Sequence, residues 1–178
     1  MRKCNTILSR VIIILVLLHA FMGSMTLLGI STVSFWQLSW LLLLAVLLHA
    51  VFGIVSTIPT IRSAKRGGRW YLRENAVFWI KRLSGIVVLI LTVFHLSAYN
   101  ASVNGVFFRR EFTTCYMVSQ LVFVMAIFVH LTVSLKSMLI AKGVISWRER
   151  RMDWMLVLSA FLLLFAVAIV VYYIRWQW

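Results

Sequence analysis

Four histidines are the residues of this chain whose type and placement best suit metal or redox chemistry. His19, His49, His95 and His130 are all the histidines in the sequence, and each lies inside a different apolar stretch. An ionisable side chain inside a membrane span is costly, and such residues usually mark functional sites. The function of the chain therefore has to account for one histidine on each of four apolar segments.

The composition places these segments in a membrane. Of the 178 residues, 63% are hydrophobic and 12% are charged, and the mean hydropathy is +0.99. Soluble domains are nearer half apolar and a quarter charged. The net charge of +14 would suggest a nucleic-acid partner in a soluble protein. Here orientation in the lipid bilayer accounts for the charge, and we expect no nucleic-acid partner.

Five stretches are long enough to cross a bilayer as helices, which takes about 20 apolar residues each. They cover residues 9–30, 36–58, 78–98, 114–138 and 154–174. We expect the first to be a retained helix and not a cleaved signal peptide, because it lacks an A-x-A site and holds a histidine. Pro59 suits the end of the second span. The predicted fold is all-α: one transmembrane domain over residues 1–178, built as a five-helix bundle.

The basic residues predict the orientation of this bundle. Fifteen of the 18 fall on one side of the predicted topology, and only Arg109, Arg110 and Arg175 fall on the other. The fifteen are Arg2, Lys3, Arg10, Arg62, Lys65, Arg66, Arg69, Arg73, Lys81, Arg82, Lys136, Lys142, Arg148, Arg150 and Arg151. Cytoplasmic loops carry an excess of cations. We therefore expect a multi-pass protein of the inner (cytoplasmic) cell membrane, with its N-terminus cytoplasmic and its C-terminus outside.

The same topology separates the two cysteines. Cys4 and Cys115 fall on opposite sides of the membrane, so they are not expected to form a disulfide. The chain has no cysteine cluster of the kind that binds a metal, which argues against an iron–sulfur centre.

A short repeat surrounds the first two histidines. Leu17–Gly23 resembles Leu47–Gly53, and in each the glycine follows the histidine by four residues, on one helix face. Such a glycine would let either a flat ligand or a neighbouring helix approach the imidazole. Both interpretations stay open from sequence.

Haem is the cofactor that four such histidines favour. Imidazole is a common iron ligand, and haem iron takes axial ligands from protein side chains. Structural zinc usually recruits cysteine, and intramembrane proton relays usually include acids. The four acids of the chain lie in predicted loops or at helix ends: Glu74, Glu111, Glu149 and Asp153. We therefore expect two b-type haems, each held by two histidines.

Depth along the helices predicts which histidines share a haem. At 1.5 Å per residue, His49 lies about 20 Å from Arg62, and His130 lies about 18 Å from Lys142. These two histidines are thus at similar depth and form a cytoplasmic-side pair. His95 lies near the outer end of its span, and His19 pairs with it by elimination.

The chain also resembles the five-helix, two-haem cytochrome b subunit of succinate dehydrogenase and fumarate reductase. The resemblance covers roughly residues 9–174. It is most specific at Arg82-Leu83-Ser84-Gly85-Ile86 followed by Phe94-His95-Leu96, and in the order of the four histidines. Two departures concern acids that some members carry: the chain has none in the loop 31–35 and none around His130.

The resemblance implies a non-catalytic, electron-carrying subunit of an oxidoreductase. It would anchor a flavoprotein and an iron–sulfur subunit on the cytoplasmic side, in a complex that could form higher oligomers. It would pass electrons between them and a membrane quinone, either menaquinone or ubiquinone. The four histidines would be the haem axial ligands.

Polar residues near the predicted membrane surfaces complete the candidate sites. For the quinone, which needs hydrogen-bond donors and a proton acceptor, the outer candidates are Trp36, Gln37, Tyr99, Asn100, Arg109 and Glu111. For haem propionates or partner docking, the candidates are Arg10, Arg62, Lys81, Arg82 and Lys136.

Two other functions remain open from sequence. One is the cytochrome b subunit of a nitrate reductase, hydrogenase or formate dehydrogenase, in which we would expect two histidines on one helix. The other is a haem-free membrane protein whose histidines serve packing or line a pore.

Overall fold

The computed structural model describes residues 2–32, 36–68, 70, 72, 75–99, 101–103, 106–108, 111–145 and 153–178. These residues form five helices: α1 (Arg2–Leu27), α2 (Trp36–Arg66), α3 (Ala76–Tyr99), α4 (Thr114–Ala141) and α5 (Asp153–Gln177). A short antiparallel ribbon of β1 (Ala101–Val103) and β2 (Val106–Phe108) joins α3 to α4 and was not predicted. All five helices are long and apolar enough to cross a membrane, which confirms the predicted five-helix, multi-pass architecture.

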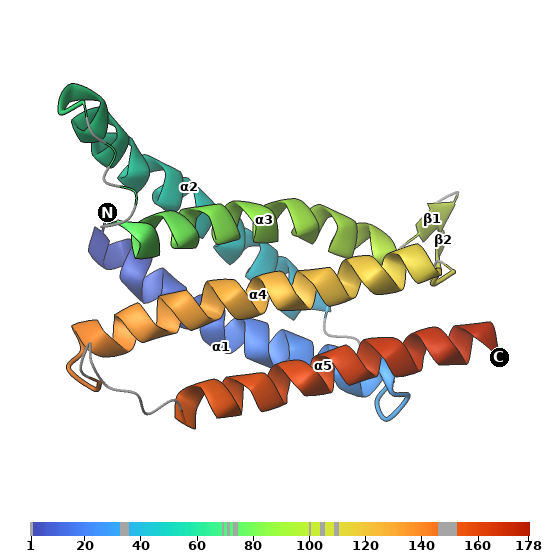
Figure 1. Ribbon diagram of the computed structural model, residues 1–178. Coiled ribbons are helices and arrows are strands. Elements are labelled where there is room, and N and C mark those ends of the chain that lie inside the picture. The colour runs from blue at the N-terminus through green and yellow to red at the C-terminus, as the bar shows by residue number, and fades with distance from the viewer. Residues whose placement is uncertain are drawn as a thin grey trace.

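Successive helices run in opposite directions, so α1 begins at one end of the bundle and α5 finishes at the other (Figure 1). We call these the N-terminal end and the C-terminal end of the bundle. Helices α1 and α2 pack together as one helical hairpin and α3 and α4 as a second, while α5 packs against α1 and α4. Helices α2 and α3 touch little, because α2 leans away from the bundle toward its own C-terminus (Figure 1).

The prediction that the second helix stops at Pro59 is wrong. Helix α2 continues through Pro59 to Arg66. A proline removes one backbone donor from a helix and usually kinks or ends it. Membrane helices tolerate proline where nearby hydroxyl groups and local adjustment compensate. Here the hydroxyls of Ser56 and Thr57, just before the proline, donate to the carbonyl of Gly53 over 2.9 and 2.8 Å.

Helix α1 begins and ends earlier than the predicted span 9–30. It finishes at Leu27 because Gly29 adopts a φ of 76°, a left-handed conformation that favours glycine. The amide of Ile30 donates to the carbonyl of Met25 over 2.9 Å, and that of Gly29 to Thr26 over 3.1 Å. These bonds close the helix C-terminus.

The buried apolar residues concentrate along α5. One cluster joins Ala98, Phe112, Ile169 and Tyr172, and a second joins Leu131, Leu158, Leu162 and Phe165. By contrast, among the described residues of α1 and α3 only Ser24 and Ala98 are buried. Helix α5 therefore supplies most of the core, against which α1 and α4 pack.

Candidate functional site

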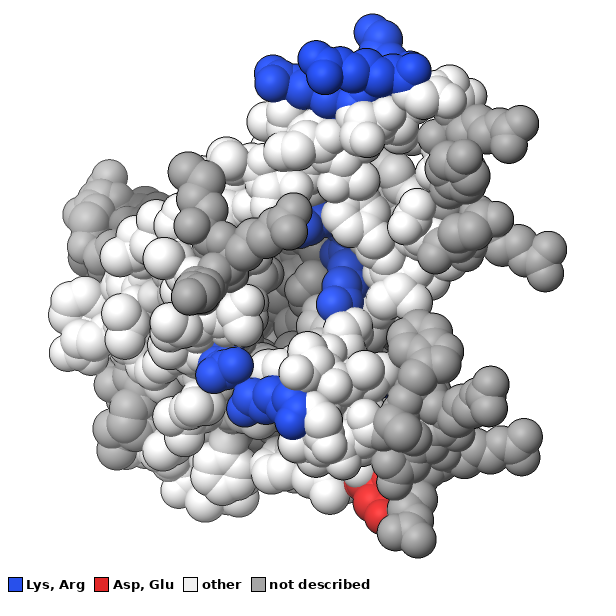
Figure 2. Space-filling view, turned by 90° about the vertical axis from the view of Figure 1, so that its left-hand side faces the viewer, with Lys and Arg blue, Asp and Glu red and all other residues white. Residues whose placement is uncertain are grey.

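The four histidines lie inside a bundle that is hollow at its N-terminal end. Figure 2 looks into that end and shows a recess between the helices, with Lys and Arg atoms on its wall. Each histidine is half-buried and comes from a different helix: His19 from α1, His49 from α2, His95 from α3 and His130 from α4. Each helical hairpin therefore supplies two histidines at different depths.

The histidines meet as two pairs, and each pair joins the two hairpins. The ring centroids of His19 and His95 are 6.0 Å apart, with an interplanar angle of 75°. Those of His49 and His130 are 6.5 Å apart, at 74°. These are the two pairs that depth along the helices predicts. The His19–His95 pair lies toward the C-terminal end of the bundle, and the His49–His130 pair toward the N-terminal end.

The spacing of each pair fits two imidazoles on opposite sides of one metal ion. With a metal–nitrogen distance of about 2 Å and a ring nitrogen about 1 Å from its ring centre, the two centroids are about 6 Å apart. Among the described residues, no group of three or more His, Cys, Asp or Glu side chains is placed to hold a metal ion. Two axial imidazoles leave the remaining metal positions to a macrocycle, as in haem.

Every one of the four imidazoles has its Nδ1 within reach of a polar side chain on the other helix of its own hairpin. In the second hairpin, His95 Nδ1 donates to Oε1 of Gln120 over 2.8 Å, and His130 Nδ1 lies 3.0 Å from the hydroxyl of Ser84. In the first hairpin, the Nδ1–hydroxyl distances are longer: 3.3 Å from His19 to Ser39, and 3.4 Å from His49 to Ser9. These partners direct each Nε2 away from its own hairpin.

The neighbouring bonds favour a protonated Nδ1 at three of the four rings. The hydroxyl of Ser9 donates to the carbonyl of Asn5 over 2.7 Å, and that of Ser84 to the carbonyl of Lys81 over 3.3 Å. Each serine oxygen is then free to accept from an imidazole Nδ1–H. Gln120 Oε1 can only accept. With Nδ1 protonated, Nε2 carries the free lone pair that binds a metal, and a fixed partner on the other nitrogen is usual for such ligands.

The Nδ1 partners follow a regular spacing that the sequence interpretation missed. Ser9 precedes His19 by ten residues and Ser39 precedes His49 by ten, but each serine bonds the histidine of the other helix. In the second hairpin, Ser84 precedes His95 by eleven residues and Gln120 precedes His130 by ten, with the same crossing. The Ser-x9-His spacing that leads into both copies of the short repeat was the signal that could have revealed these partners in the first hairpin.

The two glycines of the repeat differ in their surroundings. A Cβ at Gly23 would meet nothing within 4 Å, so this glycine leaves open space. A Cβ at Gly53 would lie 3.2 Å from Nη1 of Arg82. Gly85, within the Arg82–Ile86 motif, approaches an imidazole most closely: a Cβ there would lie 3.2 Å from Cε1 of His130.

Arg82 is the cation best placed to act on the His49–His130 pair. Its Nη2 donates to the hydroxyl of Ser56 over 2.9 Å, and its guanidinium lies 5.2 Å from the ring centre of Phe78. Its Nε is buried without a hydrogen-bond partner, and so is the indole nitrogen of Trp79. The orphaned Nε of Arg82 is a donor that an anionic ligand group would satisfy.

Two of the other predicted cations are enclosed to a similar degree. Lys81 and Lys136 are half-buried like Arg82, whereas Arg10 and Arg62 are exposed. No described acid forms an ion pair with Arg82, Arg10 or Arg62. The exposed cations suit a surface contact, and Arg82, with its buried Nε, suits an anionic ligand group.

The predicted quinone residues do not form one cluster. Tyr99 lies against the His19–His95 pair, 5.4 Å from the ring centroid of His95. Trp36, Gln37 and Glu111 are exposed, and no described contact joins them to Tyr99. Asn100 and Arg109 lie outside the described residues.

Replacing Gly85 should empty the His49–His130 site selectively. In Gly85→Val, the added side chain must displace the His130 ring, because even a Cβ would lie 3.2 Å from it. Under the two-haem prediction, the purified variant should hold about half as much haem as the parent chain, because overpacking strains the site. Pyridine haemochrome measurement checks this. Ile86→Val, at an exposed neighbouring position, is the control, and equal haem in both variants would contradict the geometry.

Comparisons with known proteins add nothing to this geometry. No family model, curated protein or solved structure matches the chain. The functional argument therefore rests on the two histidine pairs, their Nδ1 partners and the buried cation beside one of them.

Proposed function

We propose that the chain is a di-haem b membrane anchor of a complex like succinate:quinone oxidoreductase or quinol:fumarate reductase. In this role it carries electrons between an iron–sulfur subunit and a membrane quinone. The observation that supports it most strongly is the pairing of four intramembrane histidines, at 6.0 and 6.5 Å, with a side-chain partner at every Nδ1. A packing role would explain the Nδ1 bonds between neighbouring helices, but it gives no reason for the two histidine pairs that join the hairpins.

The side chains of this protein would hold the haems and set their surroundings. The Nε2 atoms of His19 and His95 would ligate one iron, and those of His49 and His130 the other. When bound, haem supplies reversible one-electron storage, and the protein tunes it through axial ligands, hydrogen bonds and burial. Gln120, Ser84, Ser39 and Ser9 would orient the ligands. The lipid-facing apolar helices would keep water from the electron path.

Arg82 would bind a propionate of the haem at the His49–His130 pair. The half-buried guanidinium has no acid partner among the described residues, and a haem carboxylate would supply an anion. The same contact would satisfy its orphaned Nε. Lys81, next to it on α3, is the second candidate for this role.

The N-terminal end of the bundle would face the cytoplasm and receive the soluble subunits. The exposed cations Arg10 and Arg62 lie at or near this end, together with Lys65 and Arg66 at the end of α2. The other cations predicted on the cytoplasmic side, at 69, 73, 148, 150 and 151, lie outside the described residues. Excess cations both retain a loop in the cytoplasm and attract an acidic partner surface.

Haem content tests this proposal directly. We expect two b-type haems per chain, both low-spin and six-coordinate. His49→Ala or His130→Ala should each remove one haem while most of the other remains, and His19→Ala or His95→Ala should remove the second. Pyridine haemochrome and visible spectra of the purified chain measure this. One haem or none in the parent chain would refute the proposal.

The two haems should also respond separately to their Nδ1 partners. Gln120→Leu removes the hydrogen-bond acceptor of His95. The His95 imidazole then donates less electron density to the iron, so the reduction potential of that haem rises. A hydrogen bond worth about 1 kcal/mol corresponds to about 40 mV upward. Ser84→Ala is the matched control at His130 and should shift the other haem. Spectroscopic redox titration distinguishes them. A single shared response would contradict the assignment of partners.

The two cysteines can report the orientation. Cys4 near the start of α1 and Cys115 near the start of α4 are both exposed and lie at opposite ends of the bundle. In right-side-out vesicles, a membrane-impermeant maleimide should label Cys115 and spare Cys4 until the membrane is permeabilised. Cys4→Ser and Cys115→Ser identify each signal, and the reverse labelling pattern would invert the topology.

A further inference from the structure

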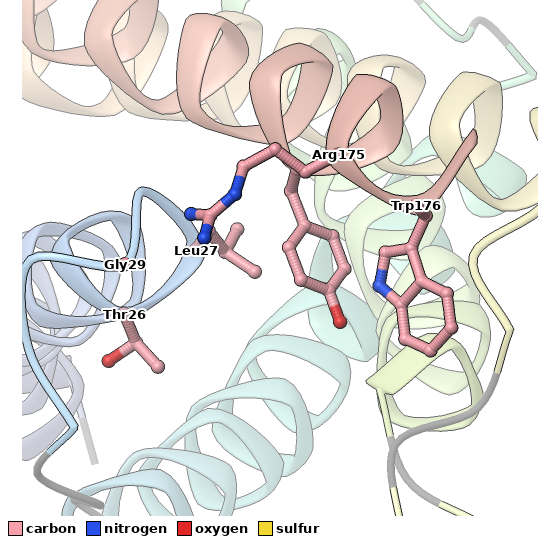
Figure 3. A pocket seen from close by; sticks show the side chains of 6 residues that line it. Thr26, Leu27, Gly29, Arg175 and Trp176 are labelled. Carbon is pink, nitrogen blue, oxygen red and sulfur yellow. The ribbon is translucent and has the colours of Figure 1, made fainter. Parts of the chain in front are cut away.

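A pocket of about 350 Å³ lies at the C-terminal end of the bundle, between the ends of α1 and α5. Its lining residues are Thr26, Leu27, Gly29, Tyr172, Arg175 and Trp176. Figure 3 shows Arg175 reaching from α5 toward the turn at Gly29, with the indole of Trp176 further along the same helix. The volume is at the lower end of the range of small-ligand sites, about 300–1,000 Å³. It suits one or two fused rings and is too small for a haem.

Two features make this a site for an uncharged, carbonyl-bearing ring. Arg175 offers up to five N–H donors, and no acid among the described residues pairs with it. Gly29 makes room for the guanidinium, because a Cβ there would lie 2.5 Å from Nη1 of Arg175. Trp176 and the buried Tyr172 add an indole N–H, a hydroxyl and two aromatic faces.

Aromatic contacts connect the pocket to the His19–His95 pair. The ring of Trp176 lies 6.2 Å from that of Tyr172, which lies 6.2 Å from Tyr99. Tyr99 in turn lies 5.4 Å from His95. A ligand in the pocket is therefore a short series of ring contacts away from one histidine pair and far from the other.

We propose that this pocket binds the head group of the membrane quinone, an inference that rests on the proposed function. The carbonyl oxygens accept from Arg175 and from Trp176 or Tyr172, and the ring stacks on the aromatic side chains. This places the quinone between α1 and α5, with Tyr99 between pocket and histidine pair, and not at Trp36 and Gln37. An anionic lipid phosphate would also attract Arg175, whereas the aromatic faces of Trp176 and Tyr172 favour a flat ring.

Equilibrium binding of a short-chain naphthoquinone tests the site. The full chain, purified in nanodiscs of zwitterionic lipid, is titrated while tryptophan fluorescence is followed, and haem content is measured on the same sample. Arg175→Gln should weaken binding about tenfold or more, as expected for a hydrogen bond to a charged donor. Arg175→Lys should recover part of the affinity. Trp176→Phe should abolish most of the quenching, whereas Trp178→Phe, at the fully exposed last residue, should not.

The outcomes separate this inference from the proposed function. A chain without haem refutes the proposed function whatever the quinone affinity. A haem-loaded chain whose quinone affinity is the same in Arg175→Gln, with equal quenching in the two tryptophan variants, overturns only the pocket. Loss of co-purified anionic phospholipid in Arg175→Gln, with unchanged quinone affinity, would identify a lipid site and also overturn it.

Discussion

The N–H of a neutral imidazole inside a membrane helix needs an acceptor, and the helix pairing of this protein provides one for the histidine of each of the four helices. An unsatisfied polar group in hydrocarbon costs several kcal/mol. Each histidine meets this need through the neighbouring helix of its own hairpin. Because the bond crosses between helices, it also fixes how far one helix slides along the other. The free Nε2 atoms are then left to the space between the hairpins.

Antiparallel packing makes this arrangement reciprocal. A step of ten residues down one helix corresponds to a step of ten up its partner, so equal Ser–His spacings on α1 and α2 align at two levels. The second hairpin repeats the pattern with Ser84 and Gln120. Ten helical residues rise about 15 Å. Under the proposed function, this spacing along the bundle separates the two haems.

The sequence was sufficient for the five helices and for the pairs of histidines because both depend on length and depth alone. Hydropathy marks a span, and counting residues from charged ends ranks the histidines by depth. The hydrogen-bond partners of the Nδ1 atoms were not predicted from the sequence. A serine in an apolar stretch usually bonds its own helix, and only the relative rotation of two helices brings Ser84 to His130. The end of α2 was predicted wrongly at Pro59 for a related reason. Whether a proline ends a helix depends on neighbouring hydroxyl groups, and single-residue helix propensities do not include them. The pocket could not be predicted either, because it forms where α1 packs against α5, and no sequence pattern indicates that these two helices are neighbours.

The two levels of the bundle differ in the chemistry around the histidines. At the His49–His130 level, Arg82 adds a half-buried positive charge whose Nε has no hydrogen-bond partner. At the His19–His95 level, the neighbours are the uncharged amide of Gln120 and the rings of Tyr99 and Phe123. A buried cation stabilises an anionic group, whereas a shell of aromatic rings suits a neutral planar molecule. The N-terminal level is therefore suited to a ligand with carboxylates. The C-terminal level is suited to exchange with an uncharged ring that enters from the lipid.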